Sequence, residues 1–297
     1  MDKPIVIIAG PTASGKTSLA ISLAKKVGGE IINADSRTIY QEMDIATAKP
    51  SKDEMTEVPH HLFDICQPVM IMTAGEYKKS ADKKIKEIHR RNRIPFLVGG
   101  TGLYLDSYVY DFDIDKTKPN PKQRRQLDNL KAEELIERIR NIDESALAGL
   151  DINNQRRLVR TLEIMLKRGV RAKMKSPKPN NVLYLALDLP RAEIYRRINE
   201  RVSAMPIDEL IKETKKLRAK YPVDTPALSG IGYREISDYL DEKITLKEAL
   251  EEIKKRTRHY AKRQFTWFKK NQDIIWVKSE KEATAQIKSF LLYLKHA

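Results

Sequence analysis

The chain has 297 residues, of which 41% are hydrophobic and 33% charged, and its 56 Lys and Arg outnumber 41 Asp and Glu to give a formal charge of +15. This composition excludes an intrinsically disordered chain and suits one large domain with a smaller one, while the positive charge favours a polyanionic partner such as nucleic acid. One cysteine, no signal-peptide pattern and no apolar run of about 18 residues exclude a disulfide scaffold and a membrane span, so we expect a cytoplasmic protein that does not bind membranes.

The first hundred residues alternate between strand and helix patterns. The apolar run at 4–10, "PIVIIAG", ends in glycine and predicts a strand buried on both faces of a parallel sheet. A helix is expected over 15–27, a second strand in "GGEIINADS" (28–36), a helix over 74–91 and a third strand in "RIPFLVGG" (93–100). This alternation predicts an α/β fold with right-handed crossovers.

The pattern changes after residue 110. Residues 111–121, "DFDIDKTKPNP", form a polar connector, and 122–169 are predicted to be helical and charged without a strand. We therefore expect a helical insertion domain at 112–179 between two parts of the core, 1–111 and 180–297. A further buried strand is predicted in "NVLYLALDLP" and a last one in "DIIWV", with helices between them, and "RAKMKSPKPNN" is expected to be a linker.

The segment "GPTASGKT" fits G-x-x-x-x-G-K-[ST] and lies between a predicted strand and a predicted helix. In such a loop, which usually binds ATP or GTP, backbone amides surround phosphate oxygens, the lysine reaches the terminal phosphates and the hydroxyl ligates Mg²⁺. The pattern indicates a site for a di- or triphosphate with Mg²⁺ as cofactor. Phosphate binding is assigned to Gly10, Pro11, Thr12, Ala13, Ser14, Gly15, Lys16 and Thr17, with Thr17 as the metal ligand.

The ends of the next two strands differ from those of a phosphoryl-transfer enzyme. Kinases and hydrolases of this fold usually add an aspartate that positions the metal and its water. The third predicted strand ends instead in "GGT", residues 99–101, whereas the second ends in Asp35, at the edge where open sheets bind ligands. The pattern alone leaves open whether Asp35 is a helix cap, an outer metal ligand or a catalytic group.

Seven segments resemble the ordered motifs of tRNA dimethylallyltransferases, also called tRNA isopentenyltransferases. They are "GPTASGKT", "NADSRTIYQEMDIATAKP", "VPHHLFDI", "PFLVGGTGLYLDS", "RRLVRTLEIM", "GIGYREI" and "RHYAKRQFTWF", spread over nearly the whole chain. The resemblance implies a P-loop NTPase-like core of three layers, with a helical insertion domain that binds the anticodon arm. It also implies transfer of a dimethylallyl group from dimethylallyl diphosphate to the N6 amine of tRNA adenine 37, with release of diphosphate.

In that reaction a carbon–oxygen bond breaks, so the protein must stabilise negative charge on the departing diphosphate. The adenine amine is a weak nucleophile, because its lone pair is delocalised, and a base should remove its proton as the new bond forms. By resemblance, Asp35 is that base, Thr101 lies near the target nucleotide and Arg201 helps to hold the diphosphate.

The resemblance further implies tRNA contacts, and the target base must leave its stack to react. The stretch 258–265 mixes cations for phosphates with rings for stacking. Besides Asp35 and Thr101, the positions carried over as tRNA-binding are Ser36, Arg37, Thr38, Arg124, Arg156, Arg157, Leu158, Val159, Arg160, Gly230, Ile231, Gly232, Tyr233, Arg234, Glu235, Arg258, His259, Tyr260, Ala261, Lys262, Arg263, Gln264 and Phe265.

The chain departs from the family pattern in two places. Arg156 stands where the family commonly has Gln, and the segment after Arg201 is shorter than usual. The sequence shows no zinc finger with paired Cys and His, and in this it resembles the bacterial-type members of the family. The adjacent His60 and His61 make a poor metal site, because no further ligands stand near them in the sequence. A monomer is the expected state.

Three alternatives remain. An adenylate isopentenyltransferase acting on free AMP, ADP or ATP needs neither the insertion nor "AKRQFTW". A small-molecule kinase using ATP leaves Asp35 without an identified metal or substrate hydroxyl to act on. A non-catalytic RNA-binding module gives the phosphate loop no task.

Overall fold

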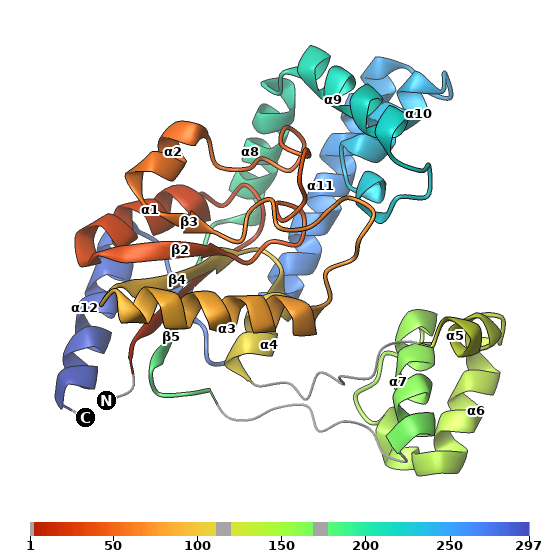
Figure 1. Cartoon of the computed structure of the whole chain (residues 1–297), viewed down its shortest axis with the longest axis horizontal. Helices are drawn as coiled ribbons and strands as arrows, with labels where there is room; N and C mark the ends of the chain where they lie inside the picture. Colours follow the sequence, from red (N-terminus) through yellow and green to blue (C-terminus); the bar gives the residue numbers. More distant parts are fainter. Residues whose placement is uncertain (1–2, 111–119, 169–177, 297) are drawn as a thin grey trace. The chain divides into compact units, whose positions relative to one another are not determined.

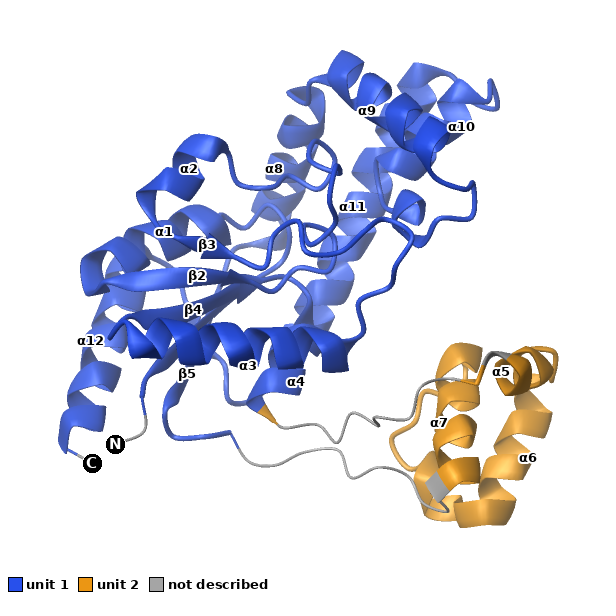
Figure 2. Ribbon diagram, viewed as in Figure 1, with its two compact units in different colours: residues 1–109, 178–297 blue, residues 110–177 orange. Residues whose placement is uncertain are grey.

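The computed structural model describes residues 3–110, 120–168 and 178–296. The chain forms two compact units, Met1–Val109 with Lys178–Ala297, and Tyr110–Pro177 (Figure 2). Most of the predicted connector at 111–121 and of the predicted linker at 171–181 lies outside the described residues.

The larger unit is built on a six-stranded sheet in the order β3-β2-β4-β1-β5-β6, with every pair parallel. The strands are β1 Ile5–Ala9, β2 Gly29–Asn33, β3 His60–His61, β4 Ile94–Gly99, β5 Val182–Leu187 and β6 Ile275–Val277. The predicted α/β fold is thereby confirmed. The sequence missed β3, because two residues paired with Ile31 and Ile32 are too short to show a period.

Helices cover both faces of this sheet (Figure 1). Apolar side chains of α1 (Lys16–Val27) and α12 (Glu280–His296) pack on one face, and α3 (Ala74–Arg90) and α4 (Gly102–Val109) lie along the other. A second apolar cluster joins the segment after β2 to four further helices, α8 Arg191–Ser203, α9 Ile207–Lys220, α10 Tyr233–Leu240 and α11 Leu246–Lys269. The short helix α2 is Lys52–Glu57. Among the described residues, no helix is both long and apolar enough to cross a bilayer.

The smaller unit is helical in its described part. It contains α5 Pro121–Asp128, α6 Ala132–Asp143, the 3₁₀ turn Glu144–Leu147 and α7 Gln155–Arg168. Its own core consists of Leu127, Leu135, Ile139, Ala146, Leu158, Val159, Leu162 and Met165. The start of α5 follows from its sequence, since the Asn120 side chain accepts from two backbone amides and proline occupies the first turn.

Glu30 on β2 is a buried carboxylate that ties the edge of the sheet together. It accepts hydrogen bonds from the Arg91 guanidinium at 3.0 and 2.6 Å and from Nε2 of His61 at 2.7 Å. Burial opposes ionisation, but these bonds outweigh it and hold the pKa of Glu30 below its ordinary value.

We expect Glu30→Gln to lower the free energy of unfolding by about 2 kcal/mol near pH 7. A lowered folded-state pKa gives stability that is present above the ordinary pKa of glutamate and is lost as the pH falls through the folded value. The difference in the free energy of unfolding between wild type and variant should therefore shrink below about pH 4.5. Urea unfolding at pH 7 and pH 4 measures this gap, and a gap that stays constant contradicts the assignment.

Candidate active site

The phosphate loop joins β1 to α1. Ala13 and Gly15 adopt left-handed backbone angles, with φ of 63° and 86°, which curl the loop. The ammonium of Lys16 donates to the Pro11 carbonyl at 3.3 Å. Burial lowers the pKa of Lys16; the charge of Asp35 opposes this shift and that of Arg201 adds to it. The loop therefore carries buried positive charge that an anion can compensate.

The Ser14 hydroxyl in the loop and Nε of Arg201 next to it are buried and have no hydrogen-bond partner among the described residues. Burial also lowers the pKa of Arg201, with Asp35 opposing the shift. Buried donors in proteins are normally paired. Their position beside the phosphate loop fits an anionic ligand that completes the site.

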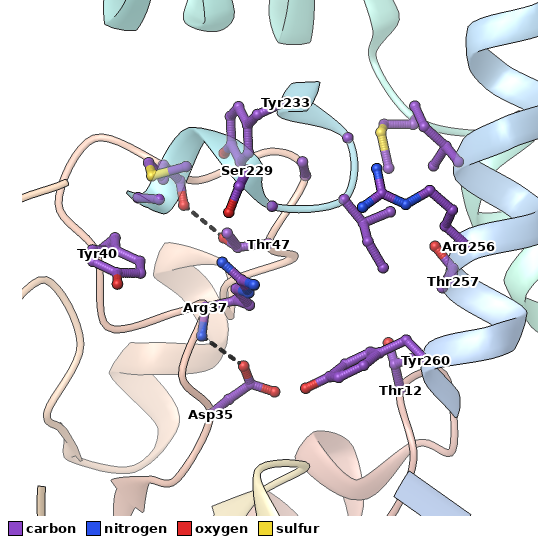
Figure 3. A pocket seen from close by; sticks show the side chains of 18 of the residues that line it. Thr12, Asp35, Arg37, Tyr40, Thr47, Ser229, Tyr233, Arg256, Thr257 and Tyr260 are labelled. Carbon is purple, nitrogen blue, oxygen red and sulfur yellow. Dashed lines mark hydrogen bonds between the residues drawn. The ribbon is translucent and has the colours of Figure 1, made fainter. Parts of the chain in front are cut away.

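Asp35 lies in the turn that follows β2. The turn is held by Asn33, whose Oδ1 accepts from the Asp35 amide at 3.0 Å and from the Thr38 hydroxyl at 2.9 Å. Oδ1 of Asp35 accepts from the Arg37 amide at 2.9 Å, and the carboxylate faces a cavity (Figure 3). Asn33 was not singled out from the sequence, although Asn before a turn is a signal for this arrangement.

Thr101 meets this turn from the end of β4. Its hydroxyl accepts from the Ser36 amide at 2.9 Å, and its own amide donates to the Ala34 carbonyl at 3.2 Å. A side chain at Gly99 would place its Cβ 2.1 Å from that carbonyl oxygen, so glycine is required where the two turns touch. Because β2 and β4 are neighbours, the structure brings Asp35 and Thr101 together.

Two cavities adjoin in the larger unit. The smaller, of about 190 Å³, is lined by the phosphate loop, and the larger, of about 330 Å³, by the turn after β2 and by helices on the carboxyl side of the sheet. The residues lining both are Thr12, Asp35, Thr47 and Arg201. Asp35 therefore lies at the junction between a phosphate site and a second chamber.

The wall of the larger cavity is aromatic and cationic. The hydroxyl of Tyr260 points toward Asp35 (Figure 3), and burial, with the charge of Asp35, raises the pKa of Tyr260 so that its hydroxyl stays protonated. The Arg263 guanidinium lies 5.7 Å from the centre of the Tyr260 ring. Glu235 is buried, pairs with Arg256 and accepts from the Gly232 amide at 2.6 Å, which fixes the segment 230–233.

The predicted tRNA-binding positions differ in accessibility. Several are exposed, among them Arg37, Arg156, Arg157, Arg234, His259, Lys262 and Arg263. The side chains of Thr38, Leu158, Val159, Tyr233, Glu235, Ala261 and Gln264 are at least 92% buried, so they shape the surface rather than forming it. Arg124 donates to buried Glu163 at 2.7 Å, and Arg258 donates to Asn199 at 2.7 Å.

The residues present fit a magnesium ion that a ligand helps to bind. Thr17 and Asp35 both line the smaller cavity. Among the described residues, no group of three His, Cys, Asp or Glu side chains would hold a metal alone. Mg²⁺ commonly binds through one or two protein oxygens and substrate phosphates. Of the two histidines of β3, His61 pairs with Glu30, and Nδ1 of His60 donates to the Val58 carbonyl at 2.6 Å. His60 also lines the smaller cavity, and its buried Nε2 has no hydrogen-bond partner among the described residues.

A family model described as IPP transferase matches residues 38–271. The chain belongs to the IPP transferase family. The tRNA dimethylallyltransferase of Halalkalibacterium halodurans is 39% identical over 286 residues, covering 93% of this chain and 91% of the relative. That of Anoxybacillus flavithermus is 40% identical over 281 residues, covering 93% and 90%.

Solved structures of IPP transferase family members agree with this assignment. The full-length tRNA isopentenylpyrophosphate transferase of Bacillus halodurans has a TM-score of 0.74 at 36% identity and covers both chains completely. A eukaryotic dimethylallyltransferase acting on tRNA has a TM-score of 0.81 at 28% identity, covering 93% of this chain and 74% of that one. The resemblance found in the sequence and the P-loop NTPase-like fold are confirmed.

Proposed function

We propose that this protein transfers a dimethylallyl group from dimethylallyl diphosphate to the N6 amine of adenine 37 in tRNA. The observation that carries the proposal is the position of Asp35 at the junction of the two cavities. One cavity offers buried cations to a diphosphate, and the other offers rings and cations to a nucleotide. A base between them can deprotonate the amine while it attacks carbon.

The proposed reaction breaks the bond between C1 of the donor and the diphosphate oxygen and forms a bond between C1 and N6. Asp35 takes the proton that N6 loses, and diphosphate leaves with the bonding electrons. Lys16, Arg201 and the loop amides stabilise the charge on that leaving group from the wall of the smaller cavity. The Thr101 hydroxyl supports the turn that carries Asp35 through its bond to Ser36.

Mg²⁺ is part of this proposal. The Thr17 hydroxyl and the diphosphate oxygens would hold it, and it would supply Lewis-acid stabilisation of the leaving group. The insertion unit is proposed to bind the anticodon arm, with exposed Arg156 and Arg157 contacting phosphates. A monomer in the cytoplasm completes the proposal.

One assay tests the function. The protein is incubated with Mg²⁺, radiolabelled dimethylallyl diphosphate and either bulk tRNA or AMP. We expect label in tRNA, located at adenine 37 after nuclease digestion, and intact diphosphate as the second product. Label in AMP would support an adenylate isopentenyltransferase instead, and label in neither acceptor would support a small-molecule kinase.

A further inference from the structure

Gln264 on α11 is a buried amide in the sequence stretch predicted to bind tRNA. Its side chain is 5% exposed, so it offers almost no surface to an RNA. Its Oε1 accepts from the Thr12 amide at 2.8 Å, and its Nε2 donates to the Gly100 carbonyl at 2.8 Å. A single side chain therefore joins the phosphate loop to the turn after β4.

The contact at Gly100 is specific to glycine. A Cβ at this position would lie 2.1 Å from Nε2 of Gln264, so a side chain there would displace the amide. Two residues further on, a Cβ at Gly102 would lie 2.2 Å from the Trp267 ring of the same helix. The glycines of "GGTG" thus let α11 approach the turn closely enough for the hydrogen bond.

The connection continues to Asp35. Gly100 precedes Thr101, whose hydroxyl accepts from the Ser36 amide and whose amide donates to the Ala34 carbonyl. These two bonds hold the residues on either side of Asp35. The chain of contacts runs from Thr12 through Gln264 to the turn of Thr101 and ends at Asp35.

The bond to Gln264 also affects the phosphate loop itself. It occupies the Thr12 amide, and the Ser14 amide donates to the Pro11 carbonyl at 3.3 Å. These two loop amides are therefore occupied within the protein and are not available to a phosphate. Gln264 therefore helps to set which part of the loop receives the leaving group.

We propose that Gln264 is a positioning residue that fixes the distance between the diphosphate cradle and Asp35, rather than a residue that contacts tRNA. This inference rests on the proposed function, since the distance matters only if a base and a leaving group act on the same carbon. Displacement of reacting groups by about 1 Å can cost about 10²-fold in rate, whereas substrate affinity depends on other contacts.

The test compares steady-state kinetics of Gln264→Met with wild type. Methionine fills a similar volume but makes neither hydrogen bond. We expect kcat to fall about 10- to 100-fold while KM for tRNA changes less than about threefold. Two results overturn the proposal. One is a Gln264→Met enzyme with wild-type kcat, and the other is an enzyme whose KM for tRNA rises while kcat stays constant, which would indicate that Gln264 contacts tRNA.

Two variants of α11 separate positioning from stability. Phe268 is fully buried and touches neither loop through a hydrogen bond, so Phe268→Leu should lower the melting temperature but leave kcat within about twofold. Thr266 is exposed and its hydroxyl donates to the Lys262 carbonyl of the same helix, so Thr266→Val should change neither quantity. If Phe268→Leu loses kcat as Gln264→Met does at an equal melting temperature, the role of Gln264 is structural only.

Two further measurements complete the design. Gln264 and Thr101 act through the same turn, so the effects of Gln264→Met and Thr101→Val on kcat should be strongly non-additive in the double variant. Additive effects contradict the coupling.

If Gln264→Met does not fold, Gln264→Glu carries the test. It keeps the acceptor for Thr12 and loses the donor to Gly100, so kcat should still fall at least about tenfold, and wild-type kcat refutes the proposal. Failure of the function itself is distinguishable, because wild type would then label no tRNA.

Discussion

Replacement of Asp35 by Asn is expected to lower kcat about 10²- to 10⁴-fold, the usual contribution of a general base. The amide cannot take a proton from the adenine amine, but its Oδ1 can still accept from the Arg37 amide that orders the turn. KM for the prenyl donor should change little, because the phosphate loop is unaltered. Rapid-quench measurement of label transfer to tRNA at saturating substrates gives kcat directly.

Asp64→Asn is the matched control for Asp35→Asn. Asp64 pairs with Lys49 at 2.5 Å, is half exposed and lines neither cavity. It loses a carboxylate of the same kind, so its kcat should remain within about twofold of wild type. An Asp35→Asn enzyme that turns over at the speed of this control would remove the base from the proposed mechanism.

Replacement of Lys16 by Met is expected to separate function from stability. kcat/KM for the prenyl donor should fall about 10²- to 10³-fold, because a cation that stabilises the leaving diphosphate is lost. The free protein should become more stable, since the ammonium is buried at a cost and methionine carries no charge. Donor kinetics and urea unfolding of the same preparation measure both effects.

The pH dependence of this gain has a definite sign. A lysine with a lowered folded-state pKa binds fewer protons when folded than when unfolded, so wild-type stability rises with pH between that value and the ordinary 10.5. The advantage of Lys16→Met should therefore shrink as the pH rises through this window. Lys25→Met, on the exposed side of α1 and paired with Glu57, should stay within about 0.5 kcal/mol of wild type with normal transfer. A Lys16→Met protein that is less stable than this control contradicts the buried-charge account.

The phosphate loop and the edge carrying Asp35 could be predicted because both depend on local patterns. An apolar run followed by "GPTASGKT" predicts strand, loop and helix, and the carboxyl ends of parallel strands meet at one edge of the sheet. The meeting of Asp35 with Thr101 follows from the pairing of β2 with β4, which the alternating pattern suggests without specifying the strand order.

The role of Gln264 could not be predicted, because its partners are 252 and 164 residues away in the chain. A polar residue within a basic helical stretch has the local pattern of an RNA contact. Leu158 and Val159 are buried because they lie on the apolar face of α7. Their helical spacing predicts this burial, but assigning the whole motif to tRNA binding overlooked it. The two-residue strand β3 has no periodicity to detect.

Both tryptophans of the chain, Trp267 and Trp276, belong to the larger unit, although the smaller unit has an apolar core of its own. Indole fluorescence therefore reports on the unfolding of the larger unit alone, whereas far-ultraviolet circular dichroism sums the helices of both units. If the two melting curves differ, the two units unfold independently. The fluorescence curve is then the one that compares the stability of active-site variants.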